Sequence, residues 1–83
     1  MNLVERVNDF STAKDNWNDY GAKPFSKKVI ARALAVANLL EGTGFKVFPT
    51  PCDSILFEKE KEEGYLQIEI FEDKDECYIK VKD

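Results

Sequence analysis

The last third of the chain, residues 54–82, reads SILFEKEKEEGYLQIEIFEDKDECYIKVK. Apolar and polar residues alternate here with a period of two, which is typical of β-strands that bury one face. The alternating segments are 54–60, 65–71 and 77–82. Charged residues separate these segments, and Gly64 closes the first separation as expected of a hairpin turn. We therefore predict an antiparallel β-meander over this part of the chain.

Alternation also assigns side chains to the two faces of this sheet. The face expected to pack on helices carries Ile55, Phe57, Leu66, Ile68, Ile70, Cys77, Ile79 and Val81. The outer face carries Leu56, Glu58, Tyr65, Gln67, Glu69, Phe71, Tyr78, Lys80 and Lys82. Aromatic residues favour strands through cross-strand packing, and they are also enriched where proteins bind one another. Both interpretations stay open, so the first candidate binding surface consists of Tyr65, Glu69, Phe71 and Tyr78.

The two ends of the predicted sheet differ in sequence. Residues 45–49 form a further β segment, but Pro49 and Pro51 cannot donate to a β-ladder, which predicts a short edge strand or a covering loop. The final segment is able to extend onto another sheet, although its alternating Lys80 and Lys82 are typical of edge protection. Sheet extension through this segment stays a third interpretation of the surface.

Helical periodicity covers the first half of the chain. Asn2 and Glu5 fit a capping box, and the apolar spacing predicts a first helix over residues 3–14. Ser26 fits the N-cap of a second helix, whose wide apolar stripe ends before Gly42. Its alanines indicate either helix propensity on a partly buried surface or a helix-mediated homodimer. The expected fold is α+β, with two N-terminal helices packed on a three- to four-stranded antiparallel β-meander.

The linker between the predicted helices, DNWNDYGAKP over residues 15–24, contains the only tryptophan of the chain. Its Asn, Asp, Gly and Pro residues favour an ordered turn. Trp17 and Tyr20 then either plug the crevice between the helices or, together with Asp19, form a rim or pocket that recognises a partner. The second candidate binding site therefore consists of Trp17, Asp19 and Tyr20.

The chain of 83 residues has the length of one domain, residues 1–83. Its net charge of −4 divides into +2 over residues 1–52 and −6 over residues 53–83. An acidic half repels nucleic acid phosphate, and Lys27–Lys28 is the largest basic cluster, so direct nucleic acid binding is not expected. The acidic hairpins leave mimicry of a nucleic acid as an alternative.

The sequence also bears on compartment and cofactors. It begins without the basic and apolar regions of a secretory signal, and no apolar run reaches the length of a membrane span. We expect a cytoplasmic protein without membrane association and with free thiols at Cys52 and Cys77. The chain has no histidine and no Cys-x-x-Cys pair, so neither a structural zinc site nor another cofactor is expected.

Residues suited to catalysis are sparse. Without histidine the usual triads cannot be assembled. Paired carboxylates such as Glu62–Glu63 and Glu72–Asp73 fall in predicted turns, where solvent keeps their acidity ordinary, whereas a catalytic pair needs a cleft. We therefore predict that the protein is not an enzyme.

A family resemblance rests on residues 16–22, NWNDYGA, followed by Pro24, an alanine-rich helix, the Pro-Thr-Pro element at 49–51 and the strand segments 55–58 and 66–70. These features resemble a group of small bacterial and phage proteins built around a Trp-Asp-x-Tyr-Gly-Ala core. The chain departs from that core at Asn18, where the common residue is Asp. The resemblance implies a prokaryotic or phage setting and an α+β fold, with no settled activity and no catalytic residue.

Together, these features predict a non-enzymatic module that binds another protein, as an accessory or inhibitor encoded by a phage or mobile element and directed at a host protein. One alternative is a small-ligand-binding or oligomeric structural domain that uses the Trp17/Tyr20 crevice. The other is an acidic nucleic-acid mimic.

Overall fold

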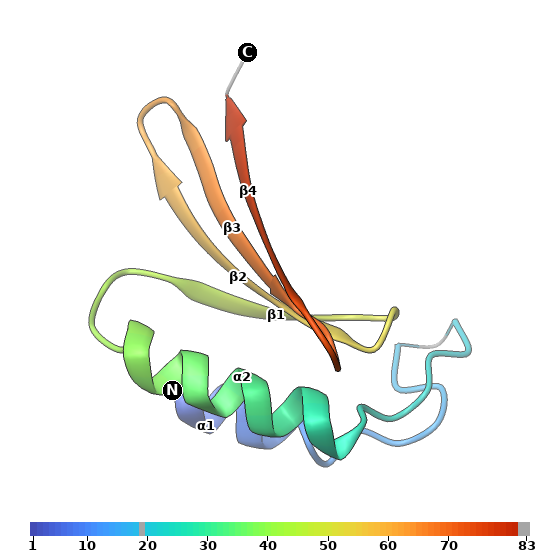
Figure 1. The fold of residues 1–83 in the computed structure, drawn as a ribbon. Coiled ribbons are helices and arrows are strands. Elements are labelled where there is room, and N and C mark those ends of the chain that lie inside the picture. Colours follow the sequence, from blue (N-terminus) through green and yellow to red (C-terminus); the bar gives the residue numbers. More distant parts are fainter. Residues whose placement is uncertain (19, 82–83) are drawn as a thin grey trace.

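The computed structural model describes residues 1–18 and 20–81, without the side chain of Val81. Over these residues the chain forms, in order, α1 (Leu3–Phe10), α2 (Lys27–Leu40), β1 (Lys46–Thr50), β2 (Ser54–Lys61), β3 (Gly64–Ile70) and β4 (Asp75–Val81). Figure 1 shows the two helices side by side beneath one end of the sheet, while β2, β3 and β4 rise away from them. The predicted α+β class is confirmed. Asp19 and Lys82 lie outside the described residues.

The short helix α1 begins and ends through side-chain hydrogen bonds. The predicted capping box is confirmed, because Asn2 Oδ1 accepts from the Glu5 backbone N–H at 2.8 Å and Glu5 Oε1 accepts from the Asn2 backbone N–H at 3.2 Å. The helix ends at Phe10, so the predicted end near residue 14 is wrong. The hydroxyls of Ser11 and Thr12 hydrogen-bond to backbone carbonyls three residues back and compete with further helical turns.

The second helix, α2, packs its small residues against the sheet. Ser26 is the predicted N-cap, and its Oγ accepts from the Val29 backbone N–H at 3.2 Å. Its buried residues are Val29, Ala33 and Ala37. Because alanine projects only a methyl group, the helix backbone can approach the strands closely. The other end of α2 is tied to α1, since the Val4 backbone N–H donates to Glu41 Oε1 at 2.9 Å.

The four strands pair antiparallel in chain order, so that β1 and β4 are the two edges of the described sheet. On the face toward the helices, Phe57 stands opposite Val47 and Ile68, and Ile55 stands opposite Ile70. The hydrophobic core contains Leu3, Val7, Val29, Ala33, Ala37, Val47, Ile55, Phe57 and Ile70. The edge strand predicted around residues 45–49 is confirmed as β1. Proline occupies position 49 within it, as edge strands tolerate.

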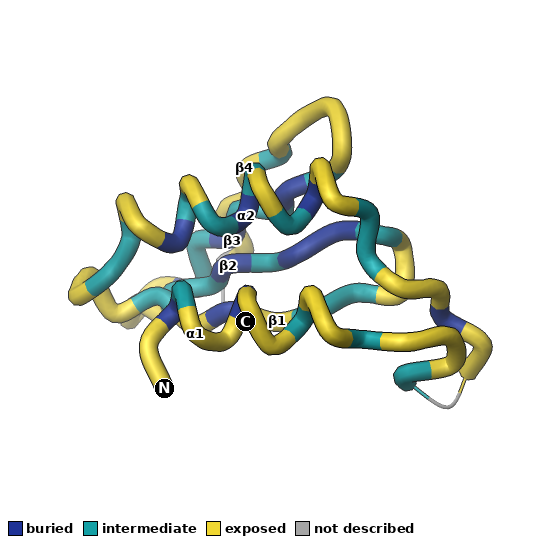
Figure 2. Tube along the Cα trace, turned by 90° about the horizontal axis from the view of Figure 1, so that it is seen from below, coloured by how far each residue is buried: buried dark blue, intermediate teal, exposed yellow. Residues whose placement is uncertain are grey.

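The helices cover the sheet unevenly. Ile55 and Phe57 are fully buried, whereas Cys77 is exposed and the side chain of Ile79 is 81% exposed. The prediction that every apolar residue on this face packs on helices is therefore wrong for Cys77 and Ile79. Alternation fixes the face of a side chain but not the reach of the helices, and β4 twists away from α1 and α2 (Figure 1). Seen from below in Figure 2, the buried stretches gather between the helices, along β2.

Candidate binding surfaces

On the face of the sheet that no described helix covers, one cross-strand row passes from apolar side chains on β1 and β2 to carboxylates on β3 and β4. In this row, Phe48 stands opposite Leu56, Leu56 opposite Glu69, and Glu69 opposite Glu76. Phe48 is 39% exposed and Leu56 is half-buried. We call this whole surface the outer face; its described members are Lys46, Phe48, Thr50, Ser54, Leu56, Glu58, Glu60, Tyr65, Gln67, Glu69, Phe71, Glu76, Tyr78 and Lys80.

The structure places the predicted surface residues along this face. Gln67 stands between Glu58 and Tyr78, and Tyr65 stands opposite Lys80, which makes Tyr65 and Tyr78 diagonal neighbours on β3 and β4. Tyr65 is half-buried, and Tyr78 is 37% exposed with its hydroxyl donating to a Glu76 carboxylate oxygen. The outer face therefore brings two tyrosines together beside a lysine and a glutamate.

Two polar pairs on the outer face are already satisfied within the chain. Ser54 is fully buried, and its hydroxyl donates to Glu69 Oε2 at 2.5 Å. Gln67 Nε2 donates to Glu58 Oε2 at 2.5 Å across β2 and β3. Glu69 therefore serves as an acceptor that holds the strands together, in addition to presenting charge on the surface.

Phe71 lies at the end of this face, in the turn from β3 to β4. Its ring is half-buried, and Lys74 Nζ stands 5.1 Å from the ring centroid, within cation–π range. The same lysine pairs with Glu76 at 2.9 Å, and this hydrogen bond and charge raise the pKa of Lys74 above its ordinary value. Phe71 thus belongs to a polar turn and only borders the tyrosine pair.

Phe48 is a surface residue that sequence reasoning missed. It lies between Val47 and Pro49, in the segment 45–49, for which the sequence analysis does not distinguish an inner from an outer face. Continuing the alternation of the other strands into β1 would have placed Val47 inward and Phe48 outward. The two prolines nearby predicted only a short edge strand or a covering loop.

In the linker, Trp17 mainly closes the turn. Its indole Nε1 donates to the Lys23 carbonyl oxygen at 2.8 Å, and its ring lies 5.3 Å from the Phe25 ring. Asn16 supports the turn, since its Oδ1 accepts from the Gly21 backbone N–H at 2.7 Å. The linker is therefore an ordered turn, and Trp17 anchors it to the helix layer through Phe25.

Tyr20 stands apart from that anchor. Its side chain is 91% exposed, and Asp19 lies outside the described residues. A hollow of about 350 Å³ next to the linker is lined by Ser11, Phe25, Lys27, Ile30, Ala31 and Leu34. Neither Trp17 nor Tyr20 lines that hollow, so the structure does not bring the two aromatic residues together around it.

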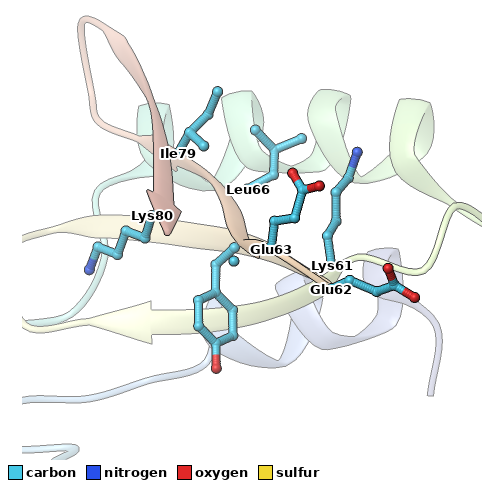
Figure 3. A pocket seen from close by; sticks show the side chains of 8 residues that line it. Lys61, Glu62, Glu63, Leu66, Ile79 and Lys80 are labelled. Carbon is cyan, nitrogen blue, oxygen red and sulfur yellow. The ribbon is translucent and has the colours of Figure 1, made fainter. Parts of the chain in front are cut away.

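A larger hollow, of about 510 Å³, lies at the turn between β2 and β3 and beside β4. Figure 3 shows Leu66 and Ile79 pointing to the same side of the sheet, with Lys80 on the other. Lys61 at the end of β2, with Glu62 and Glu63 of the turn, completes its rim. This lining suits contact with an amphipathic surface, because apolar side chains lie at its centre and charges at its edge.

Within residues 1–18 and 20–81, no three His, Cys, Asp or Glu side chains gather closely enough to hold a metal ion. Neither helix of that part has the length and apolar character needed to span a bilayer.

Comparison of the chain with protein-family models, curated proteins and solved structures finds no match. The resemblance of residues 16–22 to the Trp-Asp-x-Tyr-Gly-Ala group therefore stays a prediction from sequence.

Proposed function

We propose that this chain is a non-enzymatic module that binds another protein, and that it does so through the outer face of the sheet. The observation that carries the proposal is the exposure of Phe48 and Tyr78 on a face that the two helices leave uncovered. Aromatic residues supply large contact area at a small cost in conformational entropy, and they dominate the energetic centres of protein interfaces.

The polar groups around these aromatics support the same function. The Gln67 amide and the Ser54 hydroxyl already donate to Glu58 and Glu69 within the chain, so a partner can cover these two donors without leaving them unpaired. Covering a satisfied pair avoids the penalty of about 1–3 kcal/mol for a buried group that has lost its partner. The carboxylates of Glu58, Glu69 and Glu76 favour a partner with a basic rim around an apolar centre.

The biological setting of the proposal rests on sequence. The linker resemblance and the absence of catalytic constellations favour a cytoplasmic accessory or inhibitor of phage or mobile-element origin that acts on a host protein. An accessory or inhibitor protein acts by binding its partner, so it requires a binding surface and no catalytic residues.

Capture of a partner tests the proposal. The tagged chain should retain a stoichiometric protein from a lysate of the organism that encodes it, and the double variant Phe48→Ala, Tyr78→Ala should weaken that interaction at least about tenfold. Both residues are exposed, so the far-UV circular dichroism should stay unchanged. The matched control is Tyr20→Ala, which removes an exposed aromatic residue of the linker and should leave affinity unaltered. Loss of capture in the control, with retention in the double variant, would move the binding site to the linker.

A further inference from the structure

β4 is an edge strand that no described segment of the chain covers. It pairs with β3 on one side, and on its other side no described strand accepts or donates hydrogen bonds. Its seven residues contain neither proline nor glycine. An edge of this length presents a row of backbone donors and acceptors to any strand that approaches it.

The side chains of β4 also lack cover. Ile79 and Cys77 are exposed on the helix side, and Tyr78 is partly exposed on the outer face. Arg32 of α2 reaches only the first residue of the strand, where its guanidinium pairs with the Asp75 carboxylate. The rest of β4 rises clear of both helices, which leaves room for a neighbouring strand along its edge (Figure 1).

The charges of β4 match those of a second β4 that runs antiparallel to it. Glu76 and Lys80 lie two residues on either side of Tyr78. A two-fold axis at Tyr78 places this tyrosine opposite its own copy. Cys77 then lies opposite Ile79 of the other copy, and Glu76 lies opposite Lys80 of the other copy. Because of the symmetry, each of these two pairs occurs twice. Opposite charges directly across an antiparallel pair are stabilising. Within the described part of its own chain Lys80 has no ion-pair partner, so this pairing supplies one.

Other registers lose that match. A shift by one residue would set side chains of opposite faces against each other. A shift that brings Cys77 opposite its own copy sets Lys80 against Lys74, which is repulsive. A shift that brings Ile79 opposite its own copy sets Lys80 against Tyr78, so that Lys80 faces no carboxylate, and moves Glu76 opposite position 82, outside the described residues.

We propose that β4 of one copy pairs with β4 of a second copy of this chain, in antiparallel register about Tyr78, so that the two sheets become one. Because the two-fold axis stands perpendicular to the sheet, the helices of both copies lie on the same side. The half-buried Leu66 and the exposed Cys77 and Ile79 of the two copies then form one apolar strip between the helix layers. This pairing goes beyond the proposed function and does not depend on it.

Charge exchange at the edge tests the pairing. Sedimentation equilibrium of the full chain should show a dimer, and Glu76→Lys or Lys80→Glu alone should weaken it at least about tenfold, because each creates two like-charge contacts. The double variant Glu76→Lys, Lys80→Glu should restore the dimer, since the pairs are re-formed with exchanged signs. Lys46→Glu makes the same change on the other edge strand, β1, and should leave the dimer constant unchanged. Circular dichroism of each variant checks that the monomer folds.

Cysteine cross-linking tests the register. On a Cys52→Ser, Cys77→Ser background, Tyr78→Cys should form an intermolecular disulfide on mild oxidation, because the two thiols then face each other directly. Ile79→Cys on the same background is the control, and its two thiols should be too far apart to join. Three results would overturn the proposal: a wild-type chain that stays monomeric at all concentrations, a dimer insensitive to both charge reversals, or faster cross-linking at position 79 than at 78.

Discussion

The two edge strands of the sheet differ in length, cover and sequence. β1 has five residues, carries Pro49 and buries Val47 against the helix layer. β4 has seven residues, lacks proline and leaves Ile79 exposed on the same face. A bare edge invites pairing, and the two edges meet that hazard differently. β1 is protected because it is short and contains a proline, whereas the only protection of β4 is its charged side chains. In the proposed pairing these charges are complementary to those of a second β4. They therefore favour one partner, a second copy of the chain, over other strands.

The largest effect should come from matched truncations on the helix-side face. Ile55→Ala empties a fully buried site and should lower the free energy of unfolding by about 2–5 kcal/mol. Ile79→Ala should change it by less than about 1 kcal/mol, because only strand propensity is lost at an exposed position. Urea denaturation at concentrations too low for self-association measures both. Equal losses would mean that β4 is covered in the monomer, and the contrast between the edges would fail.

A smaller effect is expected where α2 reaches the start of β4. Arg32 Nε donates to the Phe71 carbonyl oxygen at 3.0 Å, so Arg32→Met should cost about 1 kcal/mol, solvent screening included. Amide hydrogen exchange in β4 should quicken. Lys28→Met on the same helix removes an exposed ion pair with Glu72 at 3.9 Å and should change stability by at most a few tenths of a kcal/mol. If both variants behave alike, Arg32 does not anchor β4 to the helix layer.

The smallest effect concerns the Lys74–Glu76 pair beside β4. The hydrogen bond to Glu76 and its charge raise the pKa of Lys74 above the ordinary value of 10.5. The pair therefore stabilises the folded chain fully below pH 10.5, and this contribution is lost as the pH rises through the raised pKa. The stability difference between the wild type and Lys74→Met should shrink toward zero over that range. A difference independent of pH would assign the effect of Lys74 to its contact with the Phe71 ring.

Local patterns in the sequence predicted the local structure well. Asn2 and Ser26 are the caps that the sequence indicates, because a cap needs only residues within one turn. Alternation placed Ile55 and Phe57 on the helix side for the same reason. It also placed Ile79 on that side, but the burial expected there was wrong, since cover depends on where α2 lies relative to a twisted sheet, and no local spacing contains that information.

For the candidate sites too, the sequence predicted what depends on neighbouring residues and left open what depends on the tertiary structure. The sequence identified Tyr65 and Tyr78 as members of one face, and the register makes them diagonal neighbours. It left two roles open for Trp17, because the acceptor of its indole N–H is a backbone carbonyl six residues further on. Which carbonyl a folded turn presents cannot be derived from residue types alone.

The position of Trp17 has a consequence for following the chain as it folds. It is the only tryptophan, and its ring lies against Phe25, whose ring in turn lies 6.2 Å from that of Phe10. Its fluorescence therefore reports the closing of the linker onto the two helices and is insensitive to events at β4. Stopped-flow fluorescence would time this closing, and far-UV circular dichroism recorded beside it would show whether the bulk of the secondary structure forms earlier or later.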